Sequence, residues 1–149
     1  MPITIPSEYG YVLAASAASA LQLVWLAAGV GGARKKAGIP YPYVYAERSQ
    51  VEKADAEKEK ALNLFNCAQR AHQNTLENFP AFNTMLLIGG ISHPELSAGA
   101  GAVYIFGRIL YATGYKTGEP KKRTRGSISY LGFLVLLYTT GSTIYTLLK

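Results

Sequence analysis

Two long stretches of this chain contain no charged side chain, and they limit the possible folds more than any other feature. The first covers residues 9–33 and the second covers residues 126–148. Each is longer than the roughly 20 residues that an α-helix needs to cross about 30 Å of hydrocarbon. Charged residues form only 16% of the chain, against roughly 25% in soluble domains. The sequence therefore predicts an all-α integral membrane protein.

Two further spans are interrupted by polar side chains. The segment 61–90 contains RAHQNTLENFP in its first half, and the segment 94–115 contains Arg108. Pro80 predicts a kink in the earlier segment, and the glycine pair of the following GGISH predicts its end. This short turn makes the two segments an antiparallel hairpin. We therefore expect a single membrane domain over residues 1–149, with four transmembrane helices at about 9–33, 61–90, 94–115 and 126–148.

The charge of the loops predicts how the chain is oriented. Residues 34–60 contain seven Lys or Arg and residues 116–126 contain five, whereas the N-terminal segment and the GGISH turn contain none. Because basic loops remain in the cytosol, both are expected on the cytosolic side. The first loop also has five carboxylates, so we expect it to be solvated and partly helical. The net charge of +6 then reflects membrane-flanking residues and does not indicate nucleic-acid binding.

Polar side chains in the two interrupted helices fall on narrow helical faces. The first face, here called the polar stripe, is an arc of about 100° that holds Arg70, Gln73, Asn74 and Glu77. The second is about 60° wide and holds Tyr104, Arg108, Tyr111 and Tyr115. Charged groups inside a membrane rarely face lipid, so both faces should point into the bundle or into a subunit interface. A purely structural ion pair of Glu77 with Arg70 or Arg108 would not explain the accompanying amides and tyrosines.

Both faces lie toward the predicted cytosolic side, near other basic residues. Arg34 ends the first helix there, and the basic run 121–125 precedes the fourth helix. The combined site is cationic, with Glu77 as its carboxylate. It suits a small ligand that has several carboxylates and one amine, because arginine binds carboxylates through parallel hydrogen bonds and a glutamate binds ammonium. An apolar second substrate would enter from the bilayer.

Other candidate reactive residues do not form a site. His72 lies off the polar stripe, and His93 lies in the turn at the opposite side of the membrane. Cys67 is the only cysteine, which excludes a disulfide within the chain and indicates a buried thiol. With one cysteine and two separated histidines, we expect no metal site. The sequence also lacks a P-loop, a dinucleotide-binding fingerprint and the internal repeat of a transporter.

Long segments of the sequence resemble the family of membrane-associated proteins in eicosanoid and glutathione metabolism (MAPEG). These segments are SEYGYVLAA, ARKKAGIPYPYVYA, FNCAQRAHQNTLENFP and FGRILYATGYKTGEPKKRTRG, so the resemblance covers nearly the whole chain. It is strongest to the type 3 microsomal glutathione transferase group. The resemblance implies a multi-pass, four-helix subunit that forms a homotrimer in the endoplasmic reticulum membrane. Glutathione would be the co-substrate, bound at the subunit interfaces near the cytosolic face.

The resemblance also implies roles for individual residues. The glutathione-binding set that it implies is Arg34, Arg70, Asn74, Glu77, Arg108, Tyr111 and Tyr115, to which the polar stripe adds Gln73. In the related leukotriene C4 synthases an arginine after the third helix activates the thiol, and this position corresponds to Arg123. The loop GYKTGEPKKR is one residue longer than in those synthases, so Arg125 and Lys122 remain alternatives. Asn78 stands where those synthases have a tyrosine.

The expected function is that of a membrane glutathione transferase that also reduces lipid hydroperoxides. It would act on lipophilic electrophiles through a glutathione thiolate stabilised by Arg123. Two alternatives stay open: a non-enzymatic lipid-binding scaffold, since the family includes the lipoxygenase-activating protein, and a conjugating enzyme similar to leukotriene C4 synthase. The intact polar set favours an enzyme. The expected partners are glutathione, a lipophilic electrophile or hydroperoxide, membrane lipid and further copies of the chain.

Overall fold

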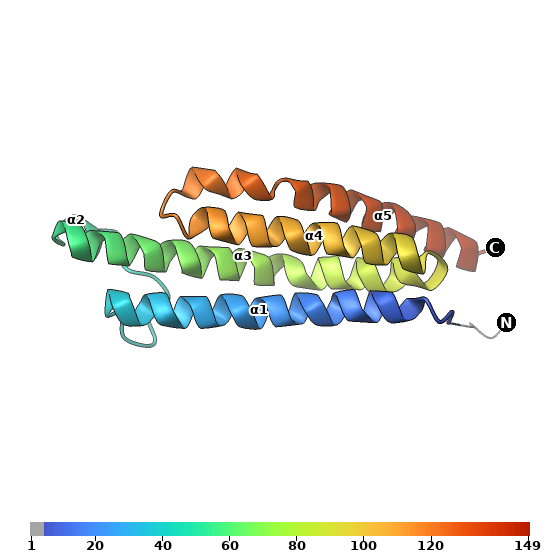
Figure 1. Cartoon of the computed structure of the whole chain (residues 1–149), viewed down its shortest axis with the longest axis horizontal. Helices are drawn as coiled ribbons and strands as arrows, with labels where there is room; N and C mark the ends of the chain where they lie inside the picture. Colours follow the sequence, from blue (N-terminus) through green and yellow to red (C-terminus); the bar gives the residue numbers. More distant parts are fainter. Residues whose placement is uncertain (1–4) are drawn as a thin grey trace.

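The computed structural model describes residues 5–149, and every regular element within them is a helix (Figure 1). The long helices of this described part are α1 (Tyr9–Ala37), α3 (Ala56–Ser92), α4 (Pro94–Tyr115) and α5 (Ile128–Leu147). The short ones are α2 (Arg48–Glu52) and the 3-10 helix η1 (Pro120–Gly126). The all-α prediction is confirmed. Residues 1–4 of the predicted domain lie outside the described residues.

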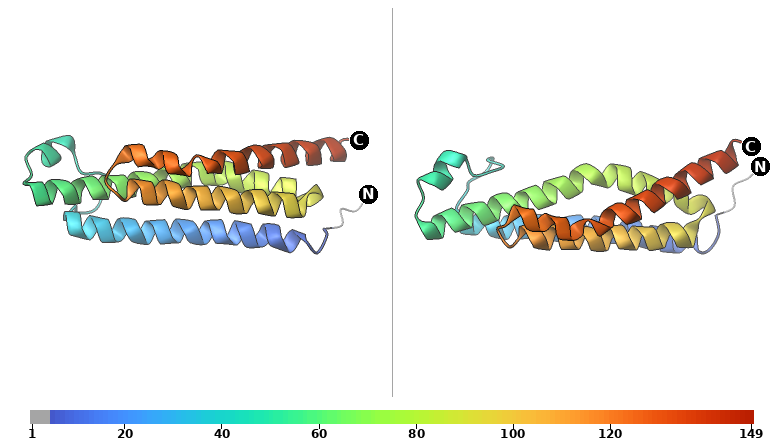
Figure 2. Two further views of the ribbon diagram at one scale, coloured as in Figure 1. Left: turned by 45° about the horizontal axis from the view of Figure 1, so that its top comes forward. Right: turned by 90° about the horizontal axis from the view of Figure 1, so that it is seen from above.

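The long helices lie side by side along one axis, and the loops collect at its two ends (Figures 1 and 2). The end of α1, the α2 segment and η1 gather at one end of the molecule. The start of α1, the turn between α3 and α4 and the end of α5 lie at the other end. Both basic loops therefore lie at the same end of the molecule, which agrees with their predicted position on one side of the membrane.

Helix α1 ends at Ala37, not near residue 33 as predicted. Gly38 then adopts the left-handed conformation with φ 60°, and its N–H bonds to carbonyls of the last turn. Glycine is favoured at this position because it has no side chain to clash there. The last turn carries three basic residues, Arg34, Lys35 and Lys36. Their charges stabilise the negative end of the helix dipole.

Helix α3 starts earlier than predicted because the chain before it has a good N-cap. The Asp55 carboxylate accepts a hydrogen bond of 2.9 Å from the backbone N–H of Lys58. Glu57 and Glu59 occupy the first turn, where negative charge favours a helix start. Pro80 lies inside α3, and the helix bends along its length in the right-hand view of Figure 2. The bend agrees with the kink predicted from this proline.

The glycine pair at the other end of α3 packs helices together and does not end the helix. α3 continues through Gly89 and Gly90 to Ser92, so the predicted end is wrong. A Cβ atom on Gly89 would lie 2.3 Å from Thr139 Oγ1, and one on Gly90 would lie 2.7 Å from Val12 Cγ2. The glycines therefore permit close contact with α5 and α1. Because the helix continues, only His93 separates α3 from α4, and the predicted antiparallel hairpin is confirmed.

Helix α4 covers the predicted range, whereas the last helix starts later than predicted. Residues 120–126 form η1, and α5 begins at Ile128. Glycines again allow the close approach of these elements. A Cβ on Gly107 would lie 2.5 Å from the backbone nitrogen of Ser129, and one on Gly132 would lie 2.5 Å from the Ala100 carbonyl oxygen. Both α4–α5 contacts are therefore backbone against backbone.

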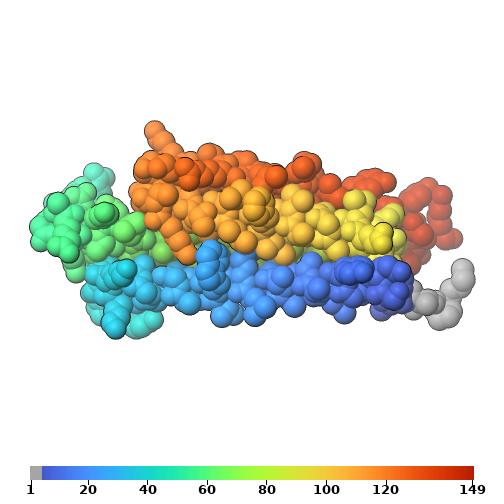
Figure 3. Space-filling model, in the orientation of Figure 1, coloured from blue at the N-terminus to red at the C-terminus, as the bar shows by residue number. Residues whose placement is uncertain are grey.

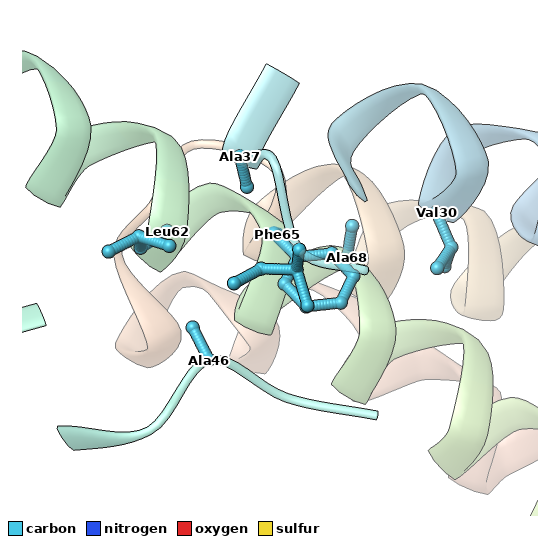
Figure 4. Close-up of a cluster of buried hydrophobic side chains, with 7 residues drawn as sticks. Val30, Ala37, Ala46, Leu62, Phe65 and Ala68 are labelled. Atoms are coloured by element: carbon cyan, nitrogen blue, oxygen red, sulfur yellow. The ribbon is translucent and has the colours of Figure 1, made fainter. Parts of the chain in front are cut away.

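Buried apolar side chains form clusters along the helices. One joins the end of α1, the following loop and the start of α3 (Figure 4), and it consists of Val30, Ala37, Ile39, Ala46, Leu62, Phe65 and Ala68. A second consists of Val12, Phe82, Leu86, Ala100, Tyr104 and Leu136. A third consists of Leu26, Cys67, Ala71, Ala112 and Tyr115. Cys67 is buried as predicted.

Two of the described helices, α1 and α5, are long and apolar enough to cross a membrane. α1 lies along one edge of the molecule for most of its length (Figure 3). It leaves large apolar side chains exposed, namely Tyr11, Leu13, Leu21, Val24 and Trp25. An apolar surface of this extent is expected where a helix contacts lipid or another chain.

The Gly132 contact gives a stability prediction. Gly132→Ala is expected to lower the free energy of unfolding in detergent by about 1–3 kcal/mol, because the added methyl group overpacks the α4–α5 contact. Gly141→Ala is the matched control in the same helix, since a Cβ there meets nothing within 4 Å. The control is expected to be neutral or to stabilise by up to about 1 kcal/mol. Unfolding followed by circular dichroism measures both, and equal stabilities would contradict the contact.

Candidate functional site

The polar stripe of α3 is centred on an ion pair between Arg70 and Glu77. Arg70 Nη1 donates to both carboxylate oxygens of Glu77, at 3.1 and 3.2 Å. The side chains are 42% and 48% exposed, respectively, so the pair lies at the surface of the single chain. An exposed pair of this kind contributes only about 0–1 kcal/mol. A ligand with its own carboxylate and ammonium groups can therefore replace it at little cost.

Arg108 of α4 lies behind the polar stripe and joins α4 to α3. Its Nη2 donates to Asn74 Oδ1 and to Thr75 Oγ1, both at 2.8 Å. The guanidinium carbon also lies 4.1 Å from the centre of the Tyr111 ring, in a favourable cation–π arrangement. Only 6% of Arg108 is exposed. Within the single chain, Arg108 orients the Asn74 amide and is itself covered.

Two tyrosines and an arginine continue the site toward η1. The rings of Tyr111 and Tyr115 meet edge to face, with centroids 5.2 Å apart. Arg123 Nη1 donates to the Tyr115 hydroxyl at 3.2 Å. This hydrogen bond is the main reason why the pKa of Arg123 is raised above its usual value. The guanidinium of Arg123 is otherwise exposed.

The position of Arg123 follows from a close contact between α4 and η1. A Cβ on Gly114 would lie 2.2 Å from the Lys122 carbonyl oxygen and 3.2 Å from the Arg123 nitrogen. Only a glycine on α4 lets η1 approach this closely. The contact fixes the register in which Arg123 reaches Tyr115. Of the two alternatives, Lys122 pairs with Glu119 at 2.6 Å, and Arg125 has no hydrogen bond from its side chain within residues 5–149.

A loop segment covers one side of the polar stripe. We call residues 38–47 the strap, because they run from the end of α1 to α2 across α3. Asn66 of α3 holds the strap in place by accepting from the Ala46 N–H at 2.8 Å and donating to the Ala46 carbonyl at 3.0 Å. The neighbouring Tyr45 then donates from its hydroxyl to Gln73 Oε1. The strap thereby places a phenol at the polar stripe.

Tyr45 is a site residue that the sequence reasoning missed. Burial raises the pKa of its phenol, and the positive charge of Arg70 opposes that shift, as expected for a cation close by. Gln73, which was placed in the site from helical spacing, has Tyr45 as its partner. The segment IPYPYVYA offers several tyrosines, and no spacing rule selects one of them. The hydrogen bonds from Asn66 to Ala46 select Tyr45, because they place this tyrosine next to Gln73.

Arg34 lies apart from the polar stripe within the single chain. Its Nη1 donates to the Tyr43 carbonyl at 2.6 Å, and its guanidinium carbon lies 4.5 Å from the Tyr41 ring centre and 4.8 Å from that of Phe65. Arg34 therefore stabilises the conformation of the strap. Within residues 5–149, the hydrogen bonds of its side chain go only to strap carbonyls.

The remaining polar residues considered in the sequence take part in packing or in local hydrogen bonds. Tyr104, the first residue of the α4 face, stacks on Phe82 in the core with ring centroids 4.1 Å apart. His93 Nε2 lies 2.9 Å from Ser142 Oγ at the opposite end of the molecule. Asn78 donates to the Asn74 carbonyl at 2.8 Å and so bonds within its own helix. Among the described residues, no three His, Cys, Asp or Glu side chains gather into a group that could hold a metal ion.

Comparison with known proteins assigns the chain to a family. Residues 12–145 match the MAPEG family. The chain belongs to the MAPEG family. It is also 35% identical over 130 residues to human "Microsomal glutathione S-transferase 2", an alignment that covers 87% of this chain and 78% of that protein. The family resemblance drawn from the sequence is thus confirmed, and the assignment to the type 3 group stays a prediction.

The candidate site of this MAPEG chain holds more positive than negative charge. Arg70 pairs with the one carboxylate, Glu77, while Arg108 bonds to Asn74 and Arg123 bonds to Tyr115. Amide and phenol groups lie between the charges. Such an arrangement can bind carboxylates and an ammonium group and can stabilise an anion near Arg123.

The anchoring of the strap can be tested independently of any activity. Asn66→Ala leaves both backbone groups of Ala46 without their partner, which should cost about 1–3 kcal/mol locally. Hydrogen exchange at the amides of residues 43–47 is expected to accelerate strongly, while exchange within α4 stays unchanged. Asn63→Ala is the control, because its side chain forms no hydrogen bond within residues 5–149. Equal exchange in the two variants would contradict the anchoring role.

Proposed function

We propose that this chain is a membrane glutathione transferase that also acts as a glutathione-dependent peroxidase on lipid hydroperoxides. The observation that carries the proposal is the Arg123–Tyr115 contact of 3.2 Å, next to the polar stripe. It supplies an arginine for a thiolate beside groups suited to the rest of glutathione. Family membership and the name of the human relative support the transferase part of the proposal.

Glutathione has the groups that the polar stripe is suited to bind. In the proposed complex, Arg70 releases Glu77 and binds a glutathione carboxylate through parallel hydrogen bonds. Glu77 then receives the ammonium group. Asn74 and Gln73 offer amide groups to the peptide bonds, while Tyr111 and Tyr115 line the side of α4. Arg108 contributes indirectly in the single chain, because it orients Asn74.

Arg123 would stabilise the glutathione thiolate. A free thiol with a pKa of about 8.5 is only a few per cent ionised at pH 7. A neighbouring cation that lowers this pKa by about 2 units makes most of the thiol ionised at that pH. Arg123 is exposed in the single chain, where water would weaken its effect. Bound substrate and a neighbouring subunit would exclude this water.

The thiolate supports two reactions. With a lipophilic electrophile, its sulfur lone pair forms a carbon–sulfur bond while the bond to the leaving group breaks, and the product is a thioether. With a lipid hydroperoxide, sulfur attacks the terminal oxygen, the O–O bond breaks, and the alkoxide takes a proton to become an alcohol. The resulting sulfenic acid reacts with a second glutathione to give a disulfide and water. A conjugating enzyme similar to leukotriene C4 synthase would use only the first reaction.

The proposed setting is a homotrimer in the endoplasmic reticulum membrane, with four spans per subunit and the site near the cytosolic face. The common end of both basic loops supports this orientation (Figure 1). Both side chains of the Arg70–Glu77 pair are almost half exposed in the single chain. This exposure supports a site between subunits. Arg34 contacts the strap and not the polar stripe of its own chain. Its proposed role in binding glutathione therefore requires a neighbouring copy.

Binding by the polar stripe is tested with three variants. Arg70→Ala and Glu77→Gln are each expected to weaken glutathione binding by a factor of ten or more, about 1.4 kcal/mol. His72→Ala should leave binding nearly intact, because His72 lies on another face of α3. Calorimetric titration of the purified protein in detergent measures all three affinities. A parent protein that binds no glutathione would instead favour the lipid-binding scaffold, and a dominant effect of His72→Ala would contradict the assigned helical face.

Activation of the thiol is tested at Arg123. Arg123→Ala is expected to bind glutathione but to lose the ultraviolet thiolate absorbance of the parent complex at pH 7. Its activity should recover partly as the pH approaches the free thiol's pKa of about 8.5, because the thiol then ionises without assistance. Arg125→Ala serves as the control and should keep the signal. If Arg125→Ala loses the signal and Arg123→Ala keeps it, the activating residue is Arg125.

A further inference from the structure

A second group of cations lies around a cavity of about 580 Å³ at the same end of the molecule. Its lining comes from the end of α1, the start of α3 and the residue that follows α4. We call it the lysine pocket, because Lys36, Lys60 and Lys116 each come from a different one of these segments. Glu57 is the carboxylate among its lining residues.

The lysine pocket is separate from the proposed glutathione site. Its α3 lining includes Ala61, Leu64 and Ala68. At 100° per residue, these positions lie roughly 130–170° around α3 from the centre of the polar stripe. Neither Arg70 nor Glu77 lines the cavity. A ligand in the lysine pocket would therefore occupy the opposite face of the helix.

Within residues 5–149, the three lysines have no anionic partner. The ion pairs of the described residues are Arg48–Glu52, Arg70–Glu77 and Glu119–Lys122. Glu57 thus forms no ion pair with the lysines around it. The lining carries three positive charges and one negative charge, and like charges around one cavity repel one another. A bound anion would remove that repulsion.

The base of the lysine pocket is apolar and open. Gly29, Gly32 and Ala33 form the α1 wall, and a Cβ on Gly32 would meet nothing within 4 Å. Leu64 and Ala68 face them from α3. Short side chains on α1 leave room for the glycerol and the first chain carbons of a lipid. A free phosphate would gain nothing from such a surface.

A tryptophan next to the lysine pocket indicates its depth in the membrane. Lys116 Nζ lies 4.1 Å above the ring of Trp25, one helical turn from Gly29 on α1. Trp25 is 43% exposed on a helix that is apolar enough to span a membrane. Tryptophan is enriched at the level of lipid headgroups, and lysines beside a span attract anionic lipid. Lys36 and Lys60 lie nearer the ends of their helices than the apolar residues Gly29 and Ala68, which matches the order of groups in a phospholipid. Lys116 reaches down to this apolar part, because its Nζ would lie 3.4 Å from a Cβ on Gly29.

The geometry points to a binding site for an anionic phospholipid, with its headgroup phosphate among Lys36, Lys60 and Lys116 and its glycerol against α1. Ammonium groups suit a phosphate because they act as point charges that need no fixed orientation. The lipid would come from the membrane leaflet on the side of the basic loops. It would hold the end of α1 against α3.

The single tryptophan of the chain reports on this site. Phosphatidic acid is titrated into the purified full chain in neutral detergent micelles while the Trp25 emission is recorded. Binding should draw Lys116 away from the indole ring and give a saturable change in emission. Phosphatidylcholine, whose phosphate is neutralised by its own choline ammonium, should give no saturable change. Glycerol phosphate, which lacks the acyl chains, should give none either. A response to glycerol phosphate equal to that of phosphatidic acid would identify a free-phosphate site and overturn the proposal.

Matched double variants separate the lysine pocket from general surface charge. Lys36→Ala/Lys60→Ala is expected to weaken the response at least about tenfold. Lys53→Ala/Lys121→Ala removes the same charge from exposed positions outside the pocket and should leave the response unchanged. Equal weakening by the two double variants would overturn the proposal, as would loss of the response when glutathione is added in excess. Circular dichroism in neutral micelles should show the parent's helix content and unfolding temperature for both.

Discussion

Arg108 carries a full positive charge with only 6% of its surface exposed, and a charge in such a place must be compensated by polar atoms. Asn74 and Thr75 supply two oxygens at 2.8 Å, and the Tyr111 ring supplies its negative face. These contacts explain why α3 and α4 cannot be uniformly apolar. They also fix the rotation of α3, because Asn74 must face α4. With Asn74 turned toward α4, the side chains of Arg70 and Glu77 lie at the surface beside it.

Once α3 and α4 are joined in this way, two backbone contacts complete the site. Gly114 lets η1 approach α4 until Arg123 reaches Tyr115. On the other side, Asn66 binds both backbone groups of Ala46 and so directs Tyr45 to Gln73. Neither contact involves a group that would touch the proposed substrate. The reactive groups are positioned by residues whose own contribution is structural.

Helical periodicity predicted which side chains of α3 share a face, because α3 is a regular helix over residues 70–77. It placed Arg70 two turns from Glu77 on one face, where the two are paired at 3.1 Å. Periodicity could not locate Tyr45, since the strap has no regular repeat and its path depends on Asn66. It also placed Tyr104 on the same face of α4 as Arg108, although stacking on Phe82 draws that ring into the core. The pair Gly89 and Gly90 resembles a helix end in the sequence, which does not reveal that α5 and α1 pack against these glycines.

The two faces of α3 differ in the type of cation that they present. The polar stripe carries the guanidinium group of Arg70, whose two parallel hydrogen bonds would select a carboxylate in the proposed complex. The lysine pocket carries ammonium groups, which would accept any orientation of a phosphate. The strap begins directly after the last turn of α1, whose Ala37 carbonyl accepts from Lys58 of α3 at 2.7 Å. A lipid that holds α1 against α3 would therefore also hold the start of the strap. Through Asn66 and Tyr45, the membrane surface and the polar stripe would then be connected by one short segment of chain.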